Sequence, residues 1–77
     1  MNEQVLSRVR EIACDVLQAD VTAESSPETI ESWDSVRHLN LVLAIEEEYG
    51  FEFLPEEMDE AKTVGGLARI VSAKRGA

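Results

Sequence analysis

Three residues that could cooperate in catalysis lie within one helical turn of each other: Asp34, Ser35 and His38, the last being the chain's single histidine. In a serine hydrolase the histidine takes the serine proton, the aspartate orients the other ring nitrogen, and backbone N–H groups stabilise the oxyanion. Here no glycine-rich turn supplies those N–H groups. The sequence therefore predicts no catalytic residue, and we expect His38 to be a half-buried residue on the inward edge of its helix.

Metal binding is the second chemistry to consider. Glu46, Glu47 and Glu48 are consecutive, and consecutive residues of a helix point about 100° apart, so three carboxylates in a row do not converge on one ion. Cys14 is the single cysteine, and it has neither a second cysteine nor the histidine cluster of a zinc site. The sequence predicts no metal site, no disulfide and no special role for Cys14.

The charge balance restricts the class of partner. Sixteen acidic residues against seven basic ones give a formal net charge of −9. This charge opposes binding to nucleic acid and favours partner proteins with basic patches. No apolar run is long enough to cross a bilayer, so we expect no membrane insertion.

The size and the first residues give further expectations. With 77 residues the chain is expected to form a single domain over residues 1–77, and we expect a monomer. The start of the sequence lacks the basic and apolar stretches of a secretory signal, so a cytoplasmic location is expected.

Hydrophobic periodicity predicts the first half of the fold. Apolar residues recur at steps of three and four from Val5 to Leu17, which indicates a first helix with Asn2 as its N-cap. The periodicity then stops, and residues 18–33 are rich in Asp, Thr, Ser, Pro and Glu. We expect this segment to be a long, ordered loop held by apolar contacts of Val21 and Ile30.

A second helix is predicted from Asp34 or Ser35 to Tyr49, with Gly50 ending it. Its apolar residues cover more than half of the circumference, so we expect it to be the central element and to pack on several sides. The remaining face is expected to be exposed and consists of Arg37, Asn40, Ala44, Glu47 and Glu48.

The last third predicts two further helices. Residues 51–54 are expected to form a loop that buries a phenylalanine, and Pro55 begins a short helix to Ala61 with Met58 as its apolar anchor. Thr63 is the predicted cap of a last helix over residues 64–74. The fold class is therefore all-α: a small four-helix bundle with a long first loop and a short third helix.

The order of these elements, together with one continuous motif, resembles the acyl carrier proteins. The motif is Asp34-Ser35-Val36, followed by Leu39 and by the run from Leu41 to Gly50 with its three consecutive glutamates. The resemblance covers nearly the whole chain. The Asp-Ser pair alone is not specific, but the run that follows it at a fixed distance is.

The resemblance implies that Ser35 accepts 4′-phosphopantetheine from coenzyme A through a phosphopantetheinyl transferase. The terminal thiol of the arm would then hold an acyl group as a thioester, and the protein itself would catalyse nothing. A phosphodiester on Ser35 would meet free N–H groups and the positive end of the helix dipole. Asp34 would cap the helix and contribute to recognition by the transferase. The alternative is that Ser35 is only part of a helix cap.

Two further groups of residues follow from the resemblance. Partner enzymes that load or process the acyl group would dock on Val36, Arg37, Asn40, Glu47 and Glu48. The acyl chain could fold back into a pocket walled by Leu39, Leu41, Val42, Ile45, Phe53, Ala61, Leu67 and Ile70, although core packing explains each of these residues equally well.

Several residues next to Ser35 depart from the pattern of carriers that serve primary fatty acid synthesis. Val36 replaces the usual leucine, and Arg37, His38 and Asn40 occupy positions that are often acidic in those carriers. An aromatic residue, Trp33, precedes the Asp-Ser pair, as is common in specialised relatives, and it is expected to pin the loop onto the bundle. We expect a specialised carrier of lipid, polyketide or secondary metabolism. An aminoacyl or peptidyl carrier and a helical adaptor without a prosthetic group remain alternatives.

Overall fold

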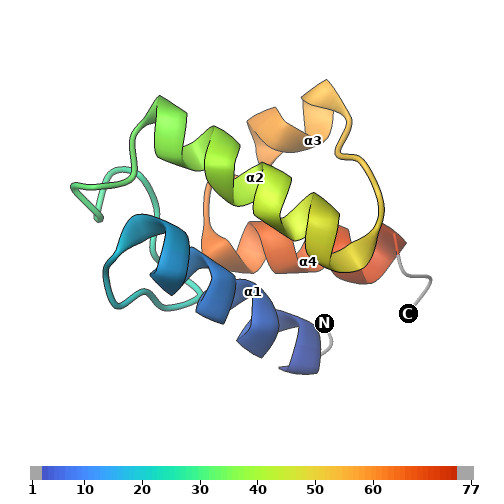
Figure 1. Cartoon of the computed structure of the whole chain (residues 1–77), viewed down its shortest axis with the longest axis horizontal. Helices are drawn as coiled ribbons and strands as arrows, with labels where there is room; N and C mark the ends of the chain where they lie inside the picture. The colour runs from blue at the N-terminus through green and yellow to red at the C-terminus, as the bar shows by residue number, and fades with distance from the viewer. Residues whose placement is uncertain (1–2, 75–77) are drawn as a thin grey trace.

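The computed structural model describes residues 3–74, and of Asp59 and Glu60 it describes the backbone only. Four α-helices occur in this part of the chain: α1 (Glu3–Leu17), α2 (Ser35–Tyr49), α3 (Pro55–Glu60) and α4 (Val64–Lys74). Figure 1 shows α1, α2 and α4 as the long elements, with α3 above α2 and the loop between α1 and α2 at the left. All four predicted helices are present. The predicted cap Asn2 lies outside the described residues.

Helix α1 makes the most extensive helix contacts, because it packs against both α2 and α4. Its buried residues recur at steps that place them on one face, and α4 supplies a matching face. The expectation that α2 is the central element was therefore wrong. The core is formed by Val5, Val9, Ile12, Ala13, Leu17, Val21, Trp33, Leu41, Val42, Ile45, Phe53, Ala61, Val64, Leu67, Ala68 and Val71.

The long loop is ordered because its side chains and carbonyl groups are bound to the helices. Val21 and Trp33 are buried, and Ile30 packs partly on the core, as predicted for Val21 and Ile30. The Val64 amide donates to the Ser25 carbonyl at 3.2 Å, and the Gly65 amide donates to the Ala23 carbonyl at 2.9 Å. These bonds satisfy amides of the α4 N-terminus that lack partners inside the helix.

Short polar contacts fix the other helix ends. Gly50 ends α2 in the left-handed conformation, with φ of 71°, and its amide donates to the Glu46 carbonyl. The Gly66 amide donates to Thr63 Oγ1 at 2.9 Å, so Thr63 caps α4 as predicted.

Within residues 3–74 no helix combines the length and the hydrophobicity that a bilayer span requires.

Candidate functional site

Ser35 is the first residue of α2, and Asp34 caps the helix in front of it. The Asp34 backbone is extended, and its carboxylate accepts a hydrogen bond from the Arg37 amide at 2.9 Å. The His38 amide closes the first helical turn by donating to the Asp34 carbonyl at 2.8 Å. Ser35 and Val36 therefore present the N–H groups that the first turn of a helix leaves without intrahelical partners.

A cavity of about 740 Å³ lies beside Ser35, between the long loop, the first turn of α2 and the segment around α3. The Ser35 residue itself is exposed. The cavity is lined by Ser26, Pro27, Glu28, Trp33, Asp34, Ser35, His38, Met58, Ala61, Lys62 and Thr63. A group attached to Ser35 would leave the helix next to a hollow with aromatic and aliphatic side chains on its wall.

His38 connects the three segments that form this cavity. The Trp33 indole N–H donates to His38 Nδ1 at 3.0 Å, and the two rings are stacked with their centroids 6.0 Å apart. Burial lowers the pKa of His38 below its ordinary value, while a hydrogen bond to the Met58 backbone acts in the opposite direction. His38 is half-buried, as predicted, and Trp33 pins the loop to the bundle.

Arg37 is directed away from the partner-facing side on which the sequence placed it. Its guanidinium donates to the Val16 carbonyl at 3.0 Å, and the Ser32 hydroxyl donates to the Leu17 carbonyl at 2.8 Å. These bonds satisfy carbonyl groups at the C-terminal end of α1, where a positive charge is favourable. Arg37 is half-buried, which corrects the expectation of an exposed side chain.

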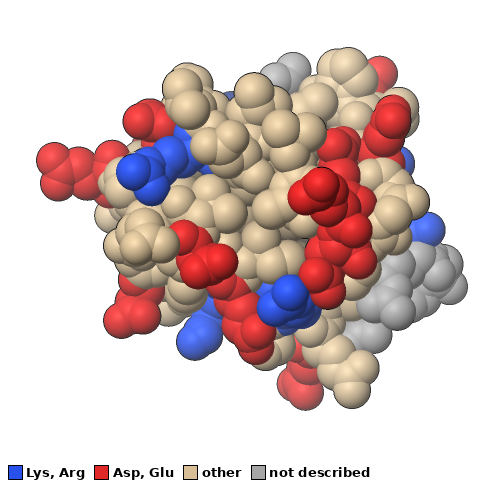
Figure 2. All heavy atoms as spheres, viewed as in Figure 1, with Lys and Arg blue, Asp and Glu red and all other residues tan. Residues whose placement is uncertain are grey.

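The outer face of α2 is more apolar than expected. Val36 is 68%, Leu39 53% and Leu43 49% exposed, so the prediction that α2 packs on several sides was wrong. The short helix α3 leaves this face uncovered. Asn40 and Glu47 are exposed as predicted, whereas Ala44 packs partly on the core. Figure 2 shows an uncharged stretch across the viewed face, with acidic side chains around it.

The residues expected to wall an acyl pocket are mostly core residues. Leu39 lies on the outer face instead, and Ile70 is partly buried. Of the eight, Ala61 alone also lines the cavity beside Ser35. Of these eight predicted pocket residues, the structure buries Leu41, Val42, Ile45, Phe53, Ala61 and Leu67 completely or nearly so.

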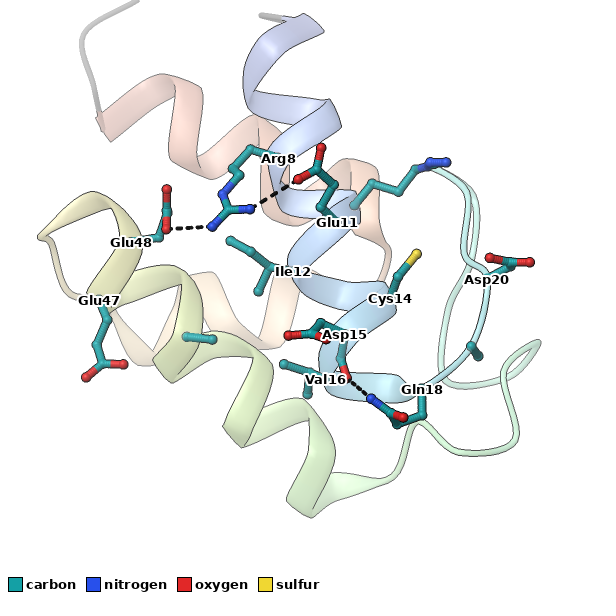
Figure 3. A pocket seen from close by; sticks show the side chains of 13 residues that line it. Arg8, Glu11, Ile12, Cys14, Asp15, Val16, Gln18, Asp20, Glu47 and Glu48 are labelled. Carbon is teal, nitrogen blue, oxygen red and sulfur yellow. Dashed lines mark hydrogen bonds and ion pairs between the residues drawn. The ribbon is translucent and has the colours of Figure 1, made fainter.

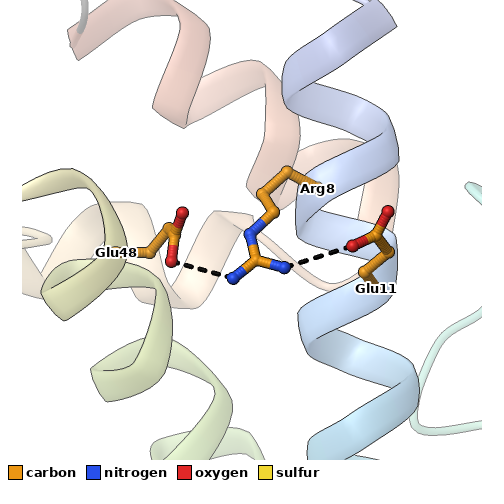
Figure 4. Close-up of polar contacts among 3 residues, drawn as sticks. All are labelled: Arg8, Glu11 and Glu48. Atoms are coloured by element: carbon orange, nitrogen blue, oxygen red, sulfur yellow. Dashed lines mark hydrogen bonds and ion pairs between the residues drawn. The ribbon is translucent and has the colours of Figure 1, made fainter.

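A larger hollow of about 1100 Å³ lies between α1 and α2, but Ser35 does not line it (Figure 3). Arg8 spans it and donates to Glu48 at 3.0 Å and to Glu11 at 3.1 Å (Figure 4). Glu48, a predicted docking residue, is therefore held by α1. Its hydrogen bond to Arg8 lowers the pKa of the Glu48 carboxyl. The bond from Arg8 to Glu48 connects α1 to α2 across this hollow.

Several cavity residues were missed from the sequence. Pro27 and Glu28 belong to a loop without periodicity, and no pattern predicts which loop residues face α2. Met58 was read only as an anchor of its helix. A signal did exist for His38, because it lies one helical turn after Ser35 and was placed on the inward edge.

Comparison with known proteins finds a matching family model and several similar proteins. Residues 7–71 match the family model described as "Phosphopantetheine attachment site". The acyl carrier protein of Picosynechococcus sp. is 30% identical over 80 residues, covering 100% of this chain and 99% of the relative. The acyl carrier protein of Thermosynechococcus vestitus is 33% identical over 78 residues, covering 96% of each chain.

A solved structure agrees with the fold. The holo acyl carrier protein from Geobacter metallireducens superposes with a TM-score of 0.83 at 32% identity, covering 94% of this chain and 86% of that one. The predicted all-α, four-helix fold is thereby confirmed, as is the resemblance read from the sequence. With the family model matching most of the chain, the protein belongs to the acyl carrier proteins, a family of carriers rather than catalysts whose cofactor is covalently attached phosphopantetheine.

Proposed function

We propose that Ser35 is the residue that carries the arm, and that the protein presents acyl intermediates as thioesters to enzymes of lipid, polyketide or secondary metabolism. One observation supports this proposal above all: an exposed serine stands at the open N-terminus of α2, beside a cavity. Both curated relatives described above are named acyl carrier proteins, which favours acyl over aminoacyl or peptidyl cargo.

The residues around Ser35 fit a phosphodiester. The first turn of α2 contains no acidic residue, and the backbone N–H groups of Ser35 and Val36 face the end of the helix where an anion is favourable. The only cation in this turn, Arg37, is engaged at α1 and does not block the position. When attached, the arm supplies the thiol that forms the thioester.

The attachment is tested by incubating the protein with coenzyme A and a broad-specificity phosphopantetheinyl transferase and then measuring the intact mass. We expect a gain of one phosphopantetheine in the wild type and in Ser7→Ala, which removes an exposed serine of α1. Ser35→Ala should gain nothing. A modified Ser35→Ala protein, or an unmodified wild type with an active transferase, would overturn the proposal.

Partner enzymes are proposed to dock on the outer face of α2 next to the arm. The sequence assigned Val36, Arg37, Asn40, Glu47 and Glu48 to docking. Because Arg37 and Glu48 are engaged at α1, we assign the contact chiefly to an outer strip of Val36, Leu39, Asn40, Leu43 and Glu47, which recur at helical spacing and are exposed. A partner would need apolar hollows for this strip and a basic residue for Glu47.

The strip is tested with the transferase as the partner. Leu39→Ser should raise the KM for loading severalfold while changing the free energy of unfolding by only about 0.5 kcal/mol, because Leu39 is not part of the core. Ser7→Ala again serves as the exposed control. An unchanged KM in Leu39→Ser would remove Leu39 from the docking surface.

The proposal of a dedicated pathway rests on the lack of acidic residues in the part of this strip nearest Ser35, from Val36 to Leu43. Asn40 is the better position for a test than Arg37, since replacing Arg37 would also disturb the end of α1. Asn40→Glu should raise turnover with an enzyme of primary fatty acid synthesis if the missing charge is what excludes this carrier. Unchanged turnover would count against specialisation.

A further inference from the structure

The bonds around His38 require one tautomer of the neutral ring. An indole N–H is a donor only, so the bond from Trp33 at 3.0 Å requires His38 Nδ1 to be an acceptor without a proton. The ring proton is then on Nε2. The Met58 amide already donates to the Leu54 carbonyl, which leaves the Met58 carbonyl to accept from the ring. Neutral His38 thus bonds the loop and α3 at once.

A second proton on the ring is incompatible with this arrangement. It would occupy Nδ1, so that two N–H groups faced each other where one hydrogen bond now exists. The bond to Met58 would survive, whereas the bond to Trp33 would be lost. Trp33 is 2% exposed, and among the described residues its indole N–H bonds only to His38, so losing the bond leaves a buried donor unsatisfied.

None of the charged side chains that the structure describes near His38 forms an ion pair with it. The same cavity is lined by two acidic residues, Glu28 and Asp34, and by one basic residue, Lys62. Arg37 is bound at the end of α1, and the Glu57 carboxylate of α3 is engaged by the Leu54 amide and by Lys74. Protonation of His38 is therefore opposed chiefly by burial.

We propose that His38 is a positioning residue for chemistry at Ser35: in its neutral form it holds Trp33 and α3 in place as walls of the cavity where the arm leaves α2, and protonation releases Trp33. This inference rests on the proposed attachment at Ser35, because the attached arm is what gives the cavity its role. His38 lies one turn after Ser35 on the same helix and lines the same cavity. It needs no contact with the arm to act, since it sets the position of the surface that a transferase meets.

Three variants separate a positioning role from a merely structural one. In His38→Gln the amide oxygen accepts from Trp33 and the amide N–H₂ donates to Met58, without a group that titrates. His38→Ala lacks both bonds, and Trp33→Phe removes the donor while keeping a large ring. The experiment records the loading rate with coenzyme A and a transferase from about pH 7.5 to about pH 5, the range over which a histidine changes charge.

The wild-type rate divided by the His38→Gln rate cancels the pH dependence of the transferase. We expect this ratio to be near one at the upper pH and to fall by about twofold or more at the lower pH. His38→Ala should load slowly throughout the range. A ratio that stays flat while the His38 ring titrates by NMR would overturn the proposal.

A second measurement does not depend on the arm. Trp33 is the single tryptophan, so its indole ¹H–¹⁵N signal reports the bond to His38 in the apo protein. The signal should shift with the His38 titration in the wild type and in Ser35→Ala, and stay constant in His38→Gln. If neither the wild type nor any variant is loaded, the attachment proposal fails, and the indole signal alone decides whether His38 holds Trp33. An indole signal that does not change as His38 titrates refutes the role proposed for His38.

Discussion

The two ends of α2 differ in how they are held. From Leu41 onward the helix contributes Leu41, Val42 and Ile45 to the core, and the Glu46 carboxylate accepts from the Phe53 amide at 2.7 Å. The residues of α2 before Leu41 contribute no buried side chain to the core, and they present Ser35 and Val36 to solvent. The helix is fixed at one end and presents Ser35, the proposed attachment residue, at the other.

On the proposal that Ser35 carries the arm, this difference explains how a small carrier positions its attachment residue. Burial of the C-terminal half holds the helix axis, so the exposed N-terminal turn needs only a cap and the contacts of His38 to stay in place. A bulky arm is then added where no core side chain has to move. The comparison predicts that substitutions of the buried residues from Leu41 onward affect stability and that substitutions of the exposed residues before Leu41 affect loading at Ser35.

The largest expected effect comes from two leucines of α2 that differ in burial. Leu41→Ala should lower the free energy of unfolding by about 2–5 kcal/mol, because Leu41 is fully buried. Leu39→Ala should change it by only about 0.5 kcal/mol or less, since Leu39 is half exposed. Urea denaturation followed by circular dichroism measures both. Equal losses would show that the outer face is packed after all.

The next largest effect concerns the end of α2 at Gly50. Its φ of 71° is in the left-handed region, and a Cβ there would meet nothing within 4 Å. Gly50→Ala should therefore cost about 1–2 kcal/mol through backbone strain alone. Gly50→Asn should cost less, because asparagine tolerates this conformation better. If the alanine variant has the stability of the wild type in urea denaturation, the left-handed assignment is wrong.

At the other end of α2, Asp34 has a cap role that can be separated from its charge. Asp34→Ala should cost about 1 kcal/mol, since it loses the bond to the Arg37 amide. Asp34→Asn keeps an acceptor and should retain most of the stability. Comparison of the loading rates of the two variants then isolates the charge. If Asp34→Asn loads as fast as the wild type, the carboxylate charge has no part in recognition by the transferase.

The smallest effect concerns Glu48, which α1 holds through Arg8. The hydrogen bond from Arg8 lowers the carboxyl pKa of Glu48 from its ordinary value of 4.5. A pKa lower in the folded than in the unfolded protein means that this contribution to stability is present above about pH 4.5 and is lost as the pH falls through the lowered pKa.

Glu48→Gln should therefore weaken the acid dependence of the unfolding midpoint near that pH, whereas Glu47→Gln should not. Glu47 is the matched control because it is the exposed neighbour and makes no ion pair with the residues that the structure describes. Thermal unfolding recorded at several pH values measures the two variants. Identical profiles would remove Arg8 and Glu48 as a brace between α1 and α2.

Helix positions could be predicted from the sequence because periodicity and caps are local signals. Asp34 before Ser35 and Gly50 after Tyr49 indicated both ends of α2, and Thr63 indicated the start of α4. The exposure of Leu39 could not be predicted in the same way. An apolar residue indicates a core only when a neighbouring element covers it, and the six-residue helix α3 does not cover the outer face of α2.

The sequence predicted the attachment residue but not the cavity beside it. Ser35 was identified from the motif, but the long-range bonds that form its surroundings join residues without a shared pattern. Arg37 reaches Val16 across 21 positions, and Trp33 meets His38 in a geometry that depends on the loop. Side-chain bonds of this kind depend on the tertiary arrangement, so their partners could not be read from spacing.

The attachment at Ser35 is tested most directly by locating the arm within the loaded protein. Trypsin cleavage after Arg10 and Arg37 gives a peptide, residues 11–37, that contains Ser25, Ser26, Ser32 and Ser35. Fragmentation of this peptide by tandem mass spectrometry should place the added phosphopantetheine on Ser35 alone. An arm found on any of the other three serines, or on a peptide outside residues 11–37, would contradict the account.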